Sequence, residues 1–252
     1  MHHSKNRISL DSDQWVMGIH AVQSTLEYAS TRAIKLHISD TGGRLGELKN
    51  TAQQIGVVTE VLTKINFKER FGDDVVHQGA VLKTHSFPYI NLNAALENRP
   101  TLCVVLDGIE DPRNLGRAAR SAFALGAELL IIPKDRAAQI TATTEKAAVG
   151  ALARLPVASV TNLNRTLEDL KKAGLWIIGS SDKNSIPAWK CDLTKPIALV
   201  VGNEEKGLRK QVAEHCDESI CIPMTYPEFS LNAADAVTVL LAETSRQRMG
   251  LA

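Results

Sequence analysis

The chain has 252 residues, of which 44% are hydrophobic, enough to build the core of one large domain or two medium ones. Its 29 basic and 28 acidic residues leave a formal net charge of +1, so composition lacks the basic excess typical of nucleic-acid-binding proteins. No apolar run approaches the roughly 20 residues that cross a bilayer, and the polar start lacks a signal-peptide core. We therefore expect a cytoplasmic protein, with any RNA-binding surface made by local clustering of charge.

The first part of the chain has the pattern of a small α/β unit, which we place at 12–86. Apolar residues recur at helical spacing within 18–29 and within 45–55. Strands are predicted over three segments, 33–39, 57–62 and 78–84. A linker follows at 87–98, where a strong apolar pattern is missing and only a short helix at 94–96 is expected.

The remaining residues, 99–252, are predicted to form the larger domain. Six apolar runs occur in it, at 102–106, 128–132, 155–160, 175–179, 197–201 and 219–222. They are nearly continuous rather than alternating, which is typical of strands covered on both faces. The predicted fold is thus α/β, with a parallel sheet of about six strands. Neither a GxGxxG nor a GxxxxGK[ST] motif follows any run, which argues against the common dinucleotide and P-loop sites.

The four cysteines are scattered, and no CxxC pair occurs among them. His215 with Cys216 and Cys221 is the nearest approach to a metal-ligand set, but the spacing matches no usual zinc site. We expect neither disulfides nor a metal.

The segment 107–120, DGIEDPRNLGRAAR, follows the first apolar run of the larger domain. Asn114 stands where the next helix is expected to begin, and Asn is a preferred helix cap. Ligands of open parallel sheets bind beyond the carboxyl ends of the strands, where this loop would lie. An ordinary α/β loop with a helix cap explains the segment equally well.

Two later loops also follow predicted strands. One is 202–208, GNEEKGL, whose glycines permit close approach of the backbone to a ligand. The other runs from IPM at 222–224 to SLN at 230–232, where Ser230 is in position to cap the last helix, near Leu231. All three loops are expected at one edge of the sheet, although each alone is a weak signal.

Together, NLGxxxR at 114–120, GNExxG at 202–207 and IPM…SLN at 222–232 resemble the three motifs of the SpoU branch of the trefoil-knotted RNA methyltransferases. The resemblance covers nearly the whole chain and is strongest to the group that methylates a guanosine 2′-hydroxyl of 23S ribosomal RNA. HQGAVL at 77–82 resembles that group's substrate-binding domain, which has a ribosomal-protein-like fold. The resemblance also implies a deep C-terminal trefoil knot, which periodicity cannot predict.

The family implies S-adenosylmethionine as methyl donor, ribosomal RNA as partner and a homodimer without membrane attachment. The reactive-centre residues it implies are Asn114, Arg120, Glu204, Ser230 and Asn232. The residues it places against the cofactor, largely through backbone groups, are Gly202, Ile222, Met224 and Leu231. Methylation of transfer RNA and a non-catalytic role in RNA binding or ribosome assembly are the alternative functions.

The transfer chemistry agrees with these residue types. A ribose hydroxyl is a poor nucleophile, so transfer needs close positioning and help in removing a proton. Arg120 is expected to reach back toward Asn114 and to hold a phosphate or polarise the hydroxyl, because helical side chains tilt toward the N-terminus. A guanidinium hardly deprotonates, so it is not an unaided base. Arg113 and Arg117 are interpreted as RNA-phosphate contacts.

Structural interpretations remain open for each residue of the set. Asn114 can be only a cap, Arg120 a solvated arm, and Glu204 a carboxylate that orients loop backbone. Ser230 and Asn232 can be helix-start residues.

The chain departs from the family pattern at a few positions. Glu205 and Tyr226 stand where glycines are usual, and Pro227 stiffens a segment that is normally rich in small residues. We expect Tyr226 to narrow the cofactor cleft. Asp235, in the last helix, would be costly if it were buried and unpaired. These differences suit a subfamily with a different RNA target or a member that binds RNA without methylating it.

Overall fold

The structure, a computed structural model, describes residues 10, 12–72, 76–182, 185–226 and 229–250. The chain packs as two compact units. The first runs to Phe87 and also includes Ile140–Arg154, and the second consists of Pro88–Gln139 and the chain from Leu155 onward. The change of unit after Phe87 falls within the predicted linker, whereas the sequence pattern predicts Ile140–Arg154 as part of the second domain.

The first unit contains a four-stranded sheet of order β1-β4-β2-β3, in which only β2 and β3 pair in parallel. Its elements are β1 (Trp15–Met17), α1 (Ile19–Tyr28), the 3-10 turn η1 (Ser30–Arg32), β2 (Ala33–Ile38), α2 (Gly43–Gln54), β3 (Val58–Val61), α3 (Lys64–Phe71), β4 (Ala80–Thr84), α6 (Ala142–Ala148) and η2 (Ala151–Ala153). The predicted helices and strands of this region are confirmed. The short β1 and the helix α3 are additional, because three and eight residues give too little periodicity to detect.

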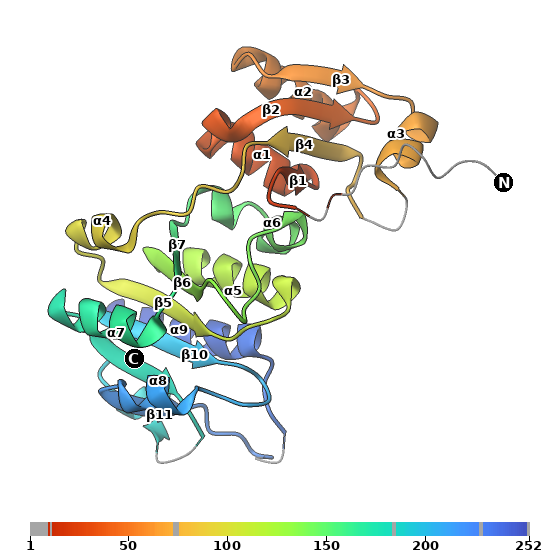
Figure 1. The fold of residues 1–252 in the computed structure, drawn as a ribbon. Helices are drawn as coiled ribbons and strands as arrows, with labels where there is room; N and C mark the ends of the chain where they lie inside the picture. Colours follow the sequence, from red (N-terminus) through yellow and green to blue (C-terminus); the bar gives the residue numbers. More distant parts are fainter. Residues whose placement is uncertain (1–9, 11, 73–75, 183–184, 227–228, 251–252) are drawn as a thin grey trace. The chain divides into compact units, whose positions relative to one another are not determined.

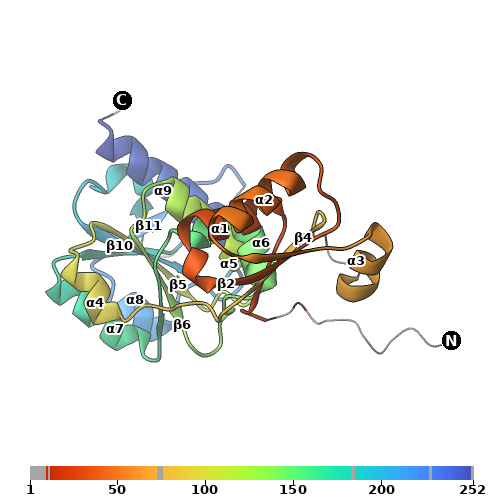
Figure 2. The ribbon, with the colours of Figure 1, turned by 90° about the horizontal axis from the view of Figure 1, so that it is seen from above.

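Hydrophobic residues at the expected spacing fix this unit. Helices α1 and α2 lie side by side, as Figure 2 shows, and bury Val22, Leu26 and Leu48 against one face of the sheet. Phe67 and Phe71 of α3, four residues apart and therefore on one helix face, pack with Trp15 and Val81 in a separate cluster.

Residues 140–154 join the first unit through a buried ion pair. Glu145 of α6 accepts from Arg32 Nη1 at 2.8 Å, and the two side chains are 1% and 5% exposed. Removing one partner of such a pair leaves an uncompensated buried charge. Local periodicity carries no signal for this contact, because its partners are 113 residues apart.

The second unit contains a seven-stranded sheet of order β7-β6-β5-β10-β8-β11-β9, in which all pairs are parallel. Its elements are α4 (Leu92–Glu97), β5 (Leu102–Asp107), α5 (Pro112–Ala124), β6 (Leu129–Pro133), β7 (Val157–Val160), α7 (Leu163–Lys172), β8 (Trp176–Ser180), β9 (Ile186–Pro187), η3 (Ala188–Lys190), β10 (Ile197–Gly202), α8 (Lys210–Glu214), β11 (Glu218–Cys221) and α9 (Ala233–Arg248). The parallel sheet is confirmed, and each of the six apolar runs contributes a strand. The seventh strand, β9, has only two residues.

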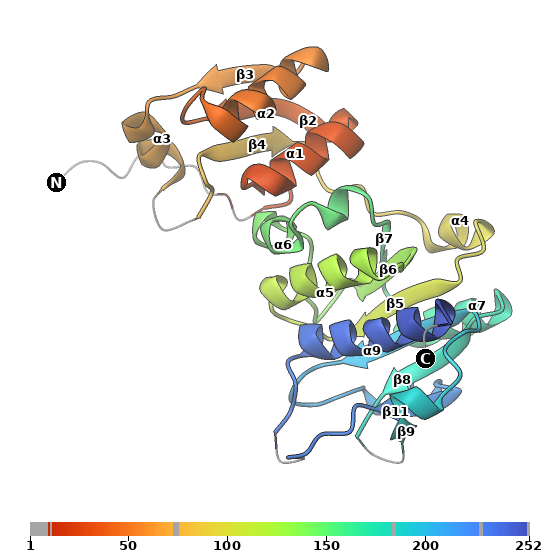
Figure 3. The ribbon, with the colours of Figure 1, turned by 180° about the vertical axis from the view of Figure 1, so that it is seen from behind.

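Helices cover both faces of this sheet, which explains its nearly continuous apolar strands. Helices α4, α7 and α8 lie on one face, and α5 and α9 lie together on the other (Figures 1 and 3). The buried core on the first face includes Val105, Leu167 and Val200. Because β10 lies between β5 and β8, the loops that follow these strands are neighbours at the carboxyl edge of the sheet.

We expect His37 to make the first unit sensitive to acid. Burial lowers the pKa of His37 from 6.5 to about 4, against an opposing contribution from Glu60. At a pH between 6.5 and 4, His37 binds a proton in the unfolded chain but not in the folded chain. The free energy of unfolding therefore falls as the pH drops from 6.5 toward 4, by up to about 3 kcal/mol.

Urea unfolding at pH 7 and pH 4.5 measures this loss. The variant His37→Phe, which retains an aromatic ring beside Trp15 and Phe71, should lose less stability over the same interval. An equal loss in both proteins would show that His37 is not responsible.

Candidate active site

The first motif forms the loop after β5 and the start of α5. Asp111 caps this helix, accepting from the backbone N–H of Arg113 at 2.7 Å, and Pro112 occupies the first helical position. The prediction that Asn114 is the cap is therefore wrong, because Asp111 caps the helix three residues earlier. Asn114 lies inside the first turn, which leaves its amide available for tertiary contacts.

The second motif forms a tight loop after β10. The backbone groups of Asn203 and Gly207 exchange hydrogen bonds of 3.1 and 2.9 Å. An added Cβ on Gly202 would clash with the backbone of Gly207, and Gly207 itself has a φ of +64°. Glycine is thus required at both ends for the loop to fold back over the strand.

Glu204 joins the three motifs. Its Oε1 atom accepts from Asn114 Nδ2 at 2.5 Å, from Asn232 Nδ2 at 2.8 Å and from the backbone N–H of Ala233 at 3.4 Å. Asn232 Nδ2 also contacts Asn114 Oδ1 at 3.2 Å. Three of the five predicted reactive-centre residues therefore form one hydrogen-bonded group, although they are far apart in the sequence.

The third motif ends at the start of α9. Asn232 caps this helix, accepting from the backbone N–H of Ala234 at 2.9 Å. The prediction that Ser230 is the cap is wrong, because the helix begins at Ala233 and only Asn232 is adjacent to it. Ser230 instead lines a cavity beside Glu204.

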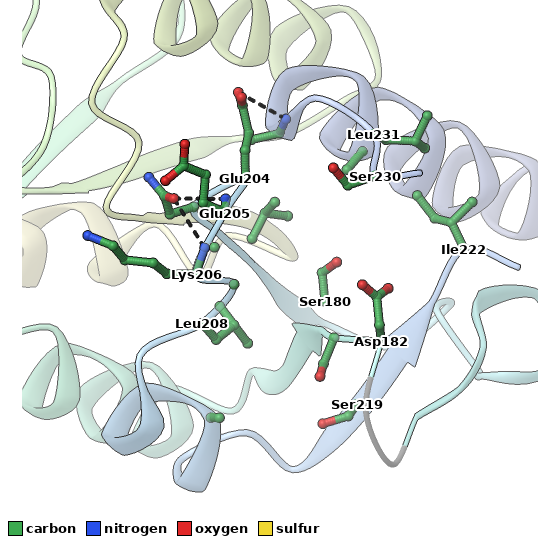
Figure 4. A pocket seen from close by; sticks show the side chains of 18 of the residues that line it. Ser180, Asp182, Glu204, Glu205, Lys206, Leu208, Ser219, Ile222, Ser230 and Leu231 are labelled. Atoms are coloured by element: carbon green, nitrogen blue, oxygen red, sulfur yellow. Dashed lines mark hydrogen bonds between the residues drawn. The ribbon is translucent and has the colours of Figure 1, made fainter. Parts of the chain in front are cut away.

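This cavity has a volume of about 770 Å³ and lies at the carboxyl edge of the sheet. Figure 4 shows the Glu204 loop on one side, Ile222, Ser230 and Leu231 on another, and a set of small polar side chains facing them. All four residues predicted to contact the cofactor line it: Gly202, Ile222, Met224 and Leu231.

The facing polar residues are Ser180, Asp182 and Ser219. No sequence motif marks these three residues. Two predicted strands end or begin near these positions, but only the strand order places β8 beside β10 and β11 beside β8.

A second, smaller cavity of about 210 Å³ lies on the α5 side of the Glu204 loop. Its lining includes Ile109, Glu110 and Asn114 together with 203–206. The Glu204 loop is therefore a wall shared by both cavities.

Arg120 is not part of the hydrogen-bonded group. Its side chain is exposed, and it neither contacts another described residue through a hydrogen bond or ion pair nor lines either cavity. The expected reach back to Asn114 is thus absent from the described contacts. Arg113 and Arg117 are also exposed. Positions 113, 117 and 120 follow helical spacing, so the three guanidinium groups form a stripe along α5.

The departures from the family pattern have different locations. Glu205 lines both cavities. Tyr226 is 66% exposed and is not among the described lining residues, so the expected narrowing of the cleft is not seen. Asp235 is exposed in the first turn of α9, where a negative charge is favourable, so the cost of burying it does not arise. Pro227 lies outside the described residues.

No group of three potential metal ligands occurs among the residues that the structure describes, and His215 Nδ1 lies 2.7 Å from the carbonyl oxygen of Gln211. Within the same part of the chain, no helix has the length and hydropathy to cross a membrane.

The fold and the site define an open parallel α/β protein with a ligand cavity at the carboxyl ends of its central strands. The model of the SpoU rRNA Methylase family matches residues 101–242, and the chain belongs to this family.

Full-length relatives give a narrower comparison. The chain is 37% identical over 242 residues to the 23S rRNA (guanosine-2′-O-)-methyltransferase RlmB of Haemophilus influenzae, covering 93% of this chain and 98% of the relative. It is 38% identical over 245 residues to the Escherichia coli protein of that name, with 93% and 99% coverage. The crystal structure of the SpoU methyltransferase AviRb from Streptomyces viridochromogenes, in complex with AdoMet, has a TM-score of 0.80, 26% identity, and 94% and 91% coverage.

SpoU methyltransferases use S-adenosylmethionine, and the larger cavity is of a size that fits this cofactor. Its volume lies within the range of about 300–1,000 Å³ typical of small-molecule sites. The backbone of Gly207 and Leu208 occupies the place where a Cβ of residue 202 would stand, so backbone groups form this part of the cavity wall.

We expect Gly202→Ala to weaken binding of the cofactor product S-adenosylhomocysteine by at least about 10-fold, because the loop must move to make room for the Cβ. Isothermal titration calorimetry measures this affinity. Gly42→Ala is the matched control, since Gly42 has an extended backbone and its added Cβ would come no closer than 3.9 Å to a neighbour. Wild-type affinity in Gly202→Ala would contradict the role of the tight 202–207 loop as a wall of the cofactor cavity.

Tyr226→Gly should leave the same affinity within about 2-fold of wild type, because the exposed side chain is not among the described lining residues. Tighter binding would show that Tyr226 closes over the cavity in solution.

Proposed function

We propose that this protein transfers a methyl group from S-adenosylmethionine to a ribose 2′-hydroxyl of ribosomal RNA, at a guanosine of 23S rRNA. The observation that carries the proposal is the Glu204 group, which joins all three motifs at the wall of the larger cavity. The substrate rests on the full-length relatives, whose printed names specify this nucleoside and this RNA.

The bound donor supplies a methyl group activated by its sulfonium. Asn114 and Asn232 hold the Glu204 carboxylate in one orientation by both donating to Oε1. Oε2 has no hydrogen bond to any described residue, which leaves it able to accept from the substrate hydroxyl and fix its direction. Orientation of this kind replaces a bimolecular encounter by a nearly unimolecular one. Ser230 is a further hydroxyl group at the cavity wall.

The arginine stripe of α5 provides a surface for RNA contact, although the net charge of the chain gives no sign of one. Arg113, Arg117 and Arg120 are exposed, and none has an ion-pair partner in the described part of the chain. Free guanidinium groups suit phosphate oxygens, which position an RNA without reading its sequence. We assign Arg120 to phosphate holding or hydroxyl polarisation, and Arg113 and Arg117 to phosphate contacts.

Several further assignments belong to this proposal. The first unit is the substrate-binding domain, the second carries the catalytic site and a trefoil knot, and the protein acts as a cytoplasmic homodimer. Support for the knot comes from the family and from the position of β10, which lies between the earlier strands β5 and β8.

Transfer RNA is the second candidate substrate. Solved structures named for tRNA modification or methylation match 59–63% of this chain at 27–28% identity and a TM-score of 0.54. The full-length relatives favour ribosomal RNA, because they also match the first unit.

Methylation of purified 23S rRNA and tRNA by the protein with labelled S-adenosylmethionine tests the function. We expect label in 23S rRNA, at a guanosine that loses its ribose methylation in cells lacking the protein. Absence of transfer and of S-adenosylhomocysteine binding at millimolar ligand would instead favour a non-catalytic RNA-binding protein.

Arg120→Ala should retain cofactor binding, since Arg120 does not line the cavity, and should lower transfer at least 10²-fold. Single-turnover transfer and calorimetry separate the two effects. Lys172→Ala, which removes an exposed cation on α7, is the control for loss of positive charge. Near-normal turnover of Arg120→Ala would refute the assigned role.

A further inference from the structure

The Glu204 loop depends on contacts outside the three motifs. Residues 203–206 line both cavities, so the position of this loop sets the cofactor site and the reactive centre together. Backbone bonds between Asn203 and Gly207 close the loop on itself but do not fix it to the rest of the fold.

Two side-chain contacts attach the loop to the end of β5. At its entry, Asn203 Nδ2 donates to the carbonyl oxygen of Gly108 at 3.0 Å. At its exit, Arg209 donates to Asp107 from its backbone N–H to Oδ2 at 2.9 Å and from Nε to Oδ1 at 2.6 Å, with Nη2 2.5 Å from Oδ1. Asp107 also pairs in register with Gly202, where the loop leaves β10. The loop therefore begins beside the backbone of Asp107 and Gly108 and ends at the buried Asp107 carboxylate.

The burial of this ion pair is unequal. The Asp107 side chain is fully buried, whereas the Arg209 side chain is 50% exposed. A buried carboxylate is costly without its partner, so it draws the guanidinium and the attached backbone toward β5. The sheet does not need this pair, since β5 and β10 are joined by six residue pairs in register.

We propose that Asp107 and Arg209 are positioning residues for methyl transfer, which clamp the loop to β5 and thereby hold Glu204 against Asn114 and Asn232. This inference rests on the proposed function. Neither residue lines the larger or the smaller cavity, so both act through the loop. A displacement of about 1 Å in a reactive centre can cost about 10²-fold in rate.

The test compares Arg209→Met, which keeps much of the aliphatic stem, with Glu204→Gln. We expect Arg209→Met to lower single-turnover transfer by about 10²-fold and to weaken S-adenosylhomocysteine binding, with RNA affinity unchanged. Arg209→Lys should recover part of the rate, because it restores the charge but not the forked donor geometry. The double variant Arg209→Met with Glu204→Gln should be little slower than the slower single variant. Both changes act on the Glu204 carboxylate, the first by releasing its loop and the second directly.

Lys171→Met is the matched control. Lys171 Nζ lies 2.7 Å from Oδ1 of Asp217, and Asp217 also accepts from a backbone N–H, as Asp107 does. Neither Lys171 nor Asp217 lines either cavity. Wild-type rates in Arg209→Met, or fully additive effects in the double variant, would overturn the clamp.

A readout without catalysis separates this inference from the proposed function. The side-chain amide NMR signals of Asn114 and Asn232 should shift in Arg209→Met and stay in place in Lys171→Met. If the wild-type protein is inactive but the amide signals still shift in Arg209→Met, the methyltransferase function is refuted and the clamp is retained. Unchanged amide signals in Arg209→Met would refute the clamp whatever the wild-type activity.

Discussion

One carboxylate oxygen holds the candidate site together. Glu204 Oε1 accepts from Asn114, Asn232 and the backbone of Ala233, so the loop after β10 is bonded directly to the starts of α5 and α9. Hydrogen bonds to an ionised acceptor are shorter and stronger than those between neutral groups. Asn232 Nδ2 also contacts Asn114 Oδ1, so this oxygen and the two side-chain amides together fix the relative positions of the three motifs.

The parallel sheet makes this convergence possible. Strands β5, β10 and β8 are neighbours and run in the same direction, so their following loops meet at one edge. The tight Asn203–Gly207 loop and the Asp107–Arg209 pair then fix the carboxylate over the strand ends. The site consists of fixed hydrogen-bonding groups, which suit a reaction that depends on positioning.

Charge is distributed locally rather than globally. The net charge of +1 gives no indication of an RNA partner, yet Arg113, Arg117 and Arg120 form an exposed stripe on the helix that carries Asn114. Many of the remaining charges neutralise one another within the fold, as in the buried pair of Arg32 and Glu145. Composition averages over both kinds of charge and therefore hides the basic stripe.

Local sequence determined the main helices, six of the parallel strands and the residue types of the three motifs, because periodicity and turn chemistry act between near neighbours. It did not determine which residues cap two of the helices, since competing caps stand within a few residues. Asp111 caps α5 instead of Asn114, and Asn232 caps α9 instead of Ser230. Only the tertiary structure decided that Ser180, Asp182 and Ser219 face the cavity and that residues 140–154 pack on the first unit. These outcomes depend on strand order and on contacts across tens of residues, which no local pattern encodes.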